Sequence, residues 1–285
     1  MRKAALVLAV MLAVCSFSLC FAESVYSTAP VSPLWNTYDP DLHWYYGQLN
    51  DREKQAFSSR YDAYATGDGS LWDISGFGLS EREQERVEFA VNRDCPELMM
   101  CSLISPIAKF FSSINDNEWF AENLETLQED LDACLQEVNR LTLTAEWGTT
   151  DLSREQAFDL HIARKTEYLL DNDGPEGTLH LDSEVRSAKS ALVNRTAVCE
   201  GFSNSVQLAM RCWGIPCIYV SGTTSGGKHA WNILCIDGSW YHYDATWNGN
   251  GGYMNLSDAE IRKTRSVSDE YERLGFILPV CGGSR

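Results

Sequence analysis

The sequence predicts an α+β protein, in which a mostly helical N-terminal region precedes an α+β domain. In the N-terminal half, apolar residues recur at intervals of three and four, as in amphipathic helices. After residue 215, short runs rich in β-branched and aromatic residues follow one another, as in strands. Asp237-Gly238 separates two of these runs and is a strong signal for a two-residue hairpin. We therefore expect a helical region over 23–147 and an α+β domain over 148–285.

The composition excludes a mainly disordered chain and argues against nucleic-acid binding. The 285 residues are 44% apolar and 11% aromatic, which is enough to form a buried core. Acidic residues outnumber basic residues by 40 to 23, so the formal net charge is −17. A surface this acidic repels phosphate backbones and anionic lipid headgroups.

The first 22 residues have the pattern of a secretory signal peptide. Arg2 and Lys3 form a basic start, Ala4–Leu19 is apolar, and Ala22 offers a small residue for cleavage. No later stretch of the sequence is long and apolar enough to span a bilayer. We expect a secreted protein, extracellular or associated with the cell surface, without stable membrane insertion after cleavage.

Ten cysteines are present, and removal of the signal peptide takes two of them. In an oxidising compartment, the even number that remains is compatible with a disulfide framework. The spacings Cys95 to Cys101 and Cys212 to Cys217 are short enough to close small loops. The alternative is that most of these cysteines are small buried apolar residues.

Four helices are predicted in the first 170 residues, after a proline-rich and aromatic lead-in over 25–46. Each follows from a capping residue or from apolar spacing. The first begins after Asn50, the second after Ser80, the third covers 118–141 and the fourth covers 153–170.

A further helix over 199–213 begins at Cys199, and strands over 216–221, 229–236 and 240–246 follow it. The start of a helix favours the thiolate form of a cysteine, because the helix dipole and unpaired N–H groups stabilise negative charge there. Alone, this is a weak signal, since a single cysteine is more often a buried apolar residue.

The hairpin brings a histidine and an aspartate together. If Ile236 pairs with Ser239, Trp231 lies opposite Asp244. His229 lies two residues before Trp231, so it shares a face with Asp244 and lies diagonally across from it. A slip of one residue would put the two side chains on opposite faces. Together with Cys199, they are the residue types that nucleophilic acyl chemistry needs: a thiolate, a base and a carboxylate that orients the base.

Five segments of the sequence resemble the bacterial transglutaminase-like domain. They are Leu192–Phe202, Trp213–Cys217, His229–Asn232, Asp237–Tyr241 and Asp244–Asn248. In order and spacing they match over about 157–248, a third of the chain, and residues 44–98 resemble more loosely the helical lead-in of secreted members.

The resemblance implies a papain-like transglutaminase core, in which the helix that bears the cysteine packs on an antiparallel sheet that bears the histidine and the aspartate. It implies Cys199 as nucleophile, His229 as base and Asp244 as the orienting acid, with no cofactor. The calcium-binding segments of animal transglutaminases have no recognisable counterpart in the sequence.

We therefore expect a secreted cysteine-dependent amide hydrolase, which acts on peptide or protein amides, including cell-wall peptides, through a thioester. Transfer of the acyl group to an amine uses the same three groups and stays open. A second alternative is a cell-surface binding module with a masked or vestigial triad. A third is a metal-dependent hydrolase built on His229, His242 and Asp244. Trp231, Trp240 and Trp247 either line a substrate channel or pack in the core.

Overall fold

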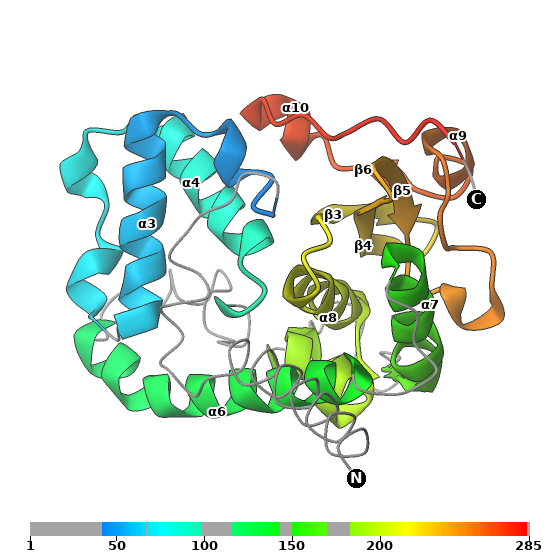
Figure 1. Cartoon of the computed structure of the whole chain (residues 1–285). Coiled ribbons are helices and arrows are strands. Elements are labelled where there is room, and N and C mark those ends of the chain that lie inside the picture. Colours follow the sequence, from blue (N-terminus) through cyan, green and yellow to red (C-terminus); the bar gives the residue numbers. More distant parts are fainter. Residues whose placement is uncertain (1–41, 67, 99–115, 143–149, 170–182, 284–285) are drawn as a thin grey trace, which may run out of the picture. The chain divides into compact units, whose positions relative to one another are not determined.

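The computed structural model describes residues 42–66, 68–98, 116–142, 150–169 and 183–283 (Figure 1). The expected signal peptide, most of the lead-in and Cys101 lie outside the described residues. No helix in the described ranges is both long and apolar enough to cross a bilayer.

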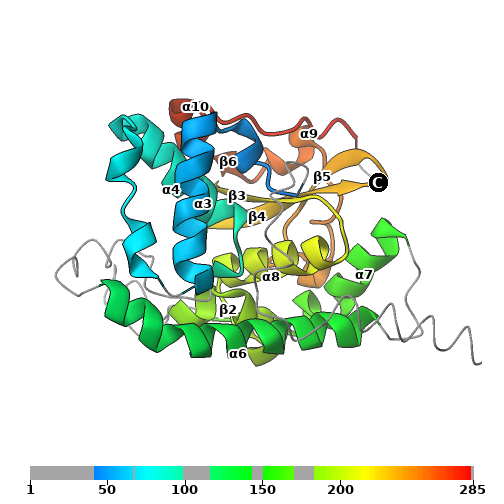
Figure 2. The ribbon, with the colours of Figure 1, turned by 60° about the vertical axis from the view of Figure 1, so that its left-hand side comes forward.

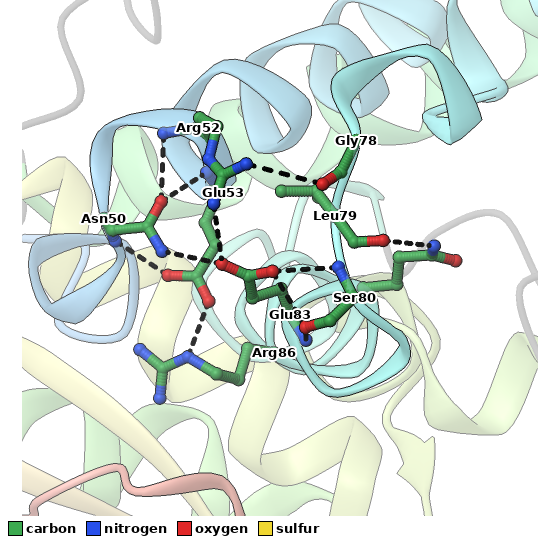
Figure 3. A network of polar contacts seen from close by, with 9 residues as sticks. Asn50, Arg52, Glu53, Gly78, Leu79, Ser80, Glu83 and Arg86 are labelled. Atoms are coloured by element: carbon green, nitrogen blue, oxygen red, sulfur yellow. Dashed lines mark hydrogen bonds and ion pairs between the residues drawn. The ribbon is translucent and has the colours of Figure 1, made fainter.

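The N-terminal region contains the helices α3 (Asp51–Thr66) and α4 (Glu81–Asp94), which lie side by side (Figure 2). Both begin at the predicted positions, because polar side chains satisfy their first N–H groups. The Ser80 side chain accepts from the Glu83 N–H, and Glu83 accepts from the Ser80 N–H. Asn50 and Glu53 make the same exchange at the start of α3 (Figure 3).

The long helix α6 (Asp116–Thr142) contacts both α3 and α8, and agrees with the predicted 118–141 to within two residues at each end. The fourth predicted helix is wrong at both ends, since α7 covers Asp151–His161. Thr150, and not Ser153, caps it by accepting from the Ser153 N–H. The helix does not reach 170, because residues 167 and 168 pair with a distant strand instead.

The catalytic half that we predicted is built around an antiparallel sheet in the order β5-β4-β3-β6. Its strands are β3 (Cys217–Thr224), β4 (Gly227–Ile236), β5 (Ser239–Tyr243) and β6 (Ser266–Val267). The helix α8 (Cys199–Cys212) packs on β3 and β4 (Figure 1). This arrangement is the α+β fold that the sequence predicts.

The predicted hairpin register is confirmed from Ile236–Ser239 to Asn232–Tyr243. Both turn residues have positive φ, 51° at Asp237 and 79° at Gly238, as a type I′ turn requires. Elsewhere, β1 (Glu167–Tyr168) pairs in parallel with β2 (Thr196–Ala197).

Two short helices, α9 (Asp258–Ile261) and α10 (Glu270–Leu274), complete the fold. Shorter helical turns connect the elements: Tyr46–Gln48, Gly69–Trp72, Ser75–Phe77, Ala163–Lys165, Ser183–Arg186, Ser190–Asn194 and Asn248–Asn250.

The loop closure that the spacing of Cys212 and Cys217 allows is not formed, because both thiols are free. Cys212 ends α8, whereas the Cys217 sulfur in β3 accepts from the side-chain amide of Asn232 at 3.5 Å. The alternative of a small buried residue fits Cys217, which is buried, whereas Cys212 is half-buried. Burial raises the pKa of both thiols, that of Cys212 to about 12.

Candidate active site

Cys199 is the first residue of α8, and the backbone before it is held close to the helix. Val198 precedes the helix and offers no side-chain cap. A side chain at Gly201 would collide with the Ser190 hydroxyl and the Val185 carbonyl, so only glycine allows this approach. The Cys199 thiol itself is half-buried, which leaves it open to a substrate.

His229 and Asp244 are in contact, as the register predicts. His229 Nε2 lies 2.8 Å from Asp244 Oδ2, and both side chains are buried. The Cys199 thiol lies close enough to the ring to help raise the pKa of His229. The structure thus brings all three predicted residues together in the order thiol, imidazole and carboxylate.

The surroundings of His229 favour its charged form. Burial alone lowers the pKa of a histidine, but the hydrogen bonds and charges of Asp244 and Cys199 outweigh it and raise the pKa of His229 from near 6.5 to about 9. The ring is therefore an imidazolium at neutral pH, and it can give a proton from the nitrogen that faces Cys199.

Tyr168 is a site residue that the sequence analysis missed. Its hydroxyl lies close enough to the Cys199 thiol and backbone N–H for both to affect its pKa. Burial, followed by the charge of Cys199, raises the pKa of Tyr168 to about 12, so the phenol remains a donor. The predicted helix over 153–170 hid this residue, since it is the pairing of Tyr168 with Ala197 in β2 that brings it to the site.

The tryptophans divide between the two expected roles. Trp231 is 1% exposed and belongs to the core. Trp240 is half-buried and packs edge-to-face on Trp44. Trp247 is 46% exposed, and its ring meets that of His229 edge-on at 6.4 Å. Trp247 therefore flanks the imidazole at the surface.

His242 does not join His229 and Asp244 in a metal site. The metal-ligand types that gather in the described part of the chain are His242, Asp258 and Cys281. Trp231 Nε1 donates to His242 Nδ1 at 3.0 Å, so the proton of the neutral ring lies on Nε2, where it meets Asp258 at 3.0 Å. With both ring nitrogens engaged in this way, neither has a free lone pair for a metal ion.

A model of the transglutaminase-like superfamily matches residues 140–245. The chain contains a transglutaminase-like domain. This match includes Tyr168, Cys199, His229 and Asp244.

Two comparisons with individual proteins gave the following similarities. The kyphoscoliosis peptidase of Mus musculus is 25% identical over 134 residues, which are 43% of this chain and 19% of that protein. A crystal structure of a TGase has 18% sequence identity and a TM-score of 0.35, over 59% of this chain and 42% of that one. The chain thus spans about a fifth of the length of the mouse protein that it matches.

Proposed function

We propose that the transglutaminase-like domain is a cysteine-dependent enzyme that hydrolyses peptide or protein amides, with Cys199, His229 and Asp244 as its catalytic residues. The observation that carries this proposal is the gathering of three residues: His229 hydrogen-bonds to the buried Asp244 at 2.8 Å, and the half-buried Cys199 interacts with the same imidazole. A nucleophile, a base and an orienting carboxylate in contact are what covalent acyl chemistry requires.

In the first half of the reaction, the Cys199 thiolate attacks the carbonyl carbon of the amide. The carbonyl oxygen becomes an oxyanion, and we assign its stabilisation to the Cys199 N–H at the start of α8 and to the Tyr168 hydroxyl beside Cys199. The imidazolium of His229 then protonates the leaving nitrogen, the C–N bond breaks, and an amine and a thioester result.

In the second half, neutral His229 takes a proton from water as the water oxygen attacks the thioester. The C–S bond breaks, the carboxylic acid leaves, and the thiolate and imidazolium are restored. An amine in place of water would give acyl transfer through the same steps. We propose hydrolysis as the main reaction because water needs no second binding site, and the name of the mouse relative, a peptidase, supports this choice.

The substrate class that we propose is a peptide or protein outside the cell, including cell-wall peptide. The signal-peptide pattern of residues 1–22 supports secretion, and the strong negative charge supports a protein substrate over a nucleic acid.

The test begins with iodoacetamide labelling of the protein at pH 7, with mass mapping of each cysteine. Cys199 should react at least about tenfold faster than the half-buried Cys235, because only a thiolate is a good nucleophile. Half-buried Cys212 and buried Cys281, whose pKa burial raises to about 12, serve as unreactive internal controls.

Peptide and protein cleavage is then measured for the wild type and for Cys199→Ala, with incorporation of a fluorescent primary amine followed in parallel. Cleavage that Cys199→Ala abolishes supports hydrolysis, and amine incorporation that exceeds cleavage selects acyl transfer. Cleavage that survives Cys199→Ala but stops with a chelator selects a metal-dependent hydrolase. Binding of peptide without turnover, with Cys199 inert, would overturn the proposal in favour of a binding module.

A further inference from the structure

We propose that Arg265 is a positioning residue of this site, which holds the Asp244 carboxylate in one orientation and balances its charge, so that His229 can both bind and release a proton. This inference rests on the proposed function and adds a fourth residue to the three that the sequence predicts.

The contacts between Arg265 and Asp244 are close and fully enclosed. Arg265 Nε and Nη2 lie 2.8 Å and 2.6 Å from Asp244 Oδ2, the same oxygen that meets His229 Nε2. The other carboxylate oxygen, Oδ1, accepts from the Trp247 N–H at 3.3 Å. The side chains of Arg265 and Asp244 are 2% and 0% exposed. With both oxygens fixed, the carboxylate cannot rotate away from the imidazole.

Arg265 is itself held by its neighbours. Its guanidinium lies over the rings of Trp247 and Tyr253, at 5.0 Å and 4.5 Å from their centroids. The remaining nitrogen, Nη1, donates to the Thr264 hydroxyl at 2.9 Å. A lysine would keep the charge at this position but could not make the planar fork or stack in the same way.

The charges at the site balance only when Arg265 is counted. In the reactive form, Cys199 and Asp244 are negative, and His229 and Arg265 are positive. The other titratable groups that interact with His229 or Asp244 are the Cys199 thiol and the phenols of Tyr168 and buried Tyr243. If Arg265 were neutral, the site would carry one excess negative charge, and its groups would hold protons more tightly. Arg265 thus limits how far Asp244 raises the pKa of His229, whose proton has to pass to the leaving nitrogen.

Arg265 also connects the buried triad to the surface. Trp247 packs on its guanidinium and lies edge-on to His229 while remaining 46% exposed. One buried cation therefore supports both the carboxylate and the aromatic side chain beside the imidazole. The sequence gives no local signal for this residue, which lies 21 positions after Asp244.

The test compares Arg265→Gln, which removes the charge, with Arg265→Lys, which keeps it. The His229 ring is titrated by NMR, and the rate of Cys199 alkylation is measured against pH. We expect Arg265→Gln to move both titrations upward by about one pH unit. Arg265→Lys should leave them near the wild-type values while lowering kcat about tenfold at an almost unchanged KM, because the fork is lost.

Arg211→Gln is the matched control, since Arg211 is a buried arginine that pairs with Glu97 at 3.1 Å. It should lower the melting temperature without moving either titration. If Arg265→Gln does not fold, the kcat of Arg265→Lys decides, and a wild-type value overturns the proposal. The proposal is also overturned if Cys199 of the wild type is reactive but Arg265→Gln titrates like the wild type.

An inert Cys199 in the wild type, together with an upward shift of the His229 titration in Arg265→Gln, would instead reject the proposed function and keep the role of Arg265. The two failures are thus distinguishable in one set of samples.

Discussion

Glu53 in the helical region and Asp244 in the candidate site are both buried carboxylates that pair with an arginine, but they share their oxygens differently. Glu53 Oε1 accepts from Arg86 at 2.7 Å, and Oε2 accepts from the Asn50 N–H at 2.7 Å. Each oxygen has its own donor, and the pair joins α3 to α4 (Figure 3).

In Asp244, a single oxygen serves His229 and Arg265 together. One of these donors, His229, has a pKa of about 9 and can give up its proton, whereas an arginine keeps its charge. We therefore expect the Glu53 pair, in which both partners keep their charge, to stabilise the fold. At Asp244, where a histidine shares the acceptor, the pair also affects the pKa of that histidine.

The largest effect that we expect comes from removing the titratable partner. His229→Ala should lower kcat for amide cleavage about 10⁴-fold, since neither a proton donor for the amine nor a base for water remains. Steady-state kinetics on a peptide substrate measure this change. His161→Ala, in a half-buried histidine at the end of α7, is the control and should retain activity. A His229→Ala variant within tenfold of the wild type would remove His229 from the mechanism.

Removal of the other carboxylate, that of Glu53, should affect stability instead. Glu53→Ala leaves the Arg86 guanidinium without its charged partner and the Asn50 N–H without its acceptor, so we expect the free energy of unfolding to fall by about 3 kcal/mol. Urea unfolding measures this loss, and the rate of Cys199 alkylation should not change in native conditions.

Glu85→Ala is the matched control, because Glu85 pairs with Arg273 at the surface, where the two side chains are 42% and 56% exposed. Its effect on stability should be much smaller than that of Glu53→Ala. If the two variants were equally stable, the buried pair between α3 and α4 would be no more important than a surface pair.

These two carboxylates also show which contacts a sequence reveals. Glu53 accepts from the N–H of Asn50, three residues earlier, and the capping rule predicts the start of α3 from that spacing alone. The hairpin dipeptide fixes the register that puts His229 beside Asp244, although they are 15 residues apart. Local rules therefore predict the starts of α3 and α4, the hairpin and the contact between His229 and Asp244.

The contacts that the sequence does not reveal are those that no local rule connects. Tyr168 reaches Cys199 only because β1 pairs with β2, and the apolar spacing around it favours a helix instead. Arg265 contacts Asp244 although 21 residues separate them in the sequence, and no helix or strand periodicity relates the two positions. Such positions depend on tertiary packing, which overrides local propensity.

Tyr168 is expected to contribute less than His229 but more than a merely structural residue. Tyr168→Phe removes one hydroxyl beside the Cys199 N–H, so we expect kcat to fall about 100-fold with little change in KM, as for loss of one oxyanion donor. Steady-state kinetics on the same peptide measure both constants. Tyr46→Phe in the helical region is the control and should change neither kcat nor KM. A rise in KM at constant kcat would show that the hydroxyl binds substrate and does not stabilise the oxyanion.

The smallest effect is a change with pH, and it depends on the sign of the His229 shift. A raised pKa means that the ring keeps its proton to higher pH, so the imidazolium persists up to about pH 9, whereas an ordinary histidine loses its proton above about 6.5. Cleavage of an amide, which needs that proton on the leaving nitrogen, should hold its rate to about pH 9 and then fall about tenfold per pH unit.

A matched ester substrate makes this prediction specific, because an alkoxide leaves more easily than an amide nitrogen without protonation. The ester rate should therefore decline less than the amide rate above pH 9, and the free energy of unfolding, measured over the same range, should show that the fold persists. If both substrates lost activity together near pH 6.5 to 7, His229 would behave as an unperturbed histidine. Asp244 would then not raise the pKa of His229. It would be a structural partner only, as Glu53 is, and the distinction between the two carboxylates would fail.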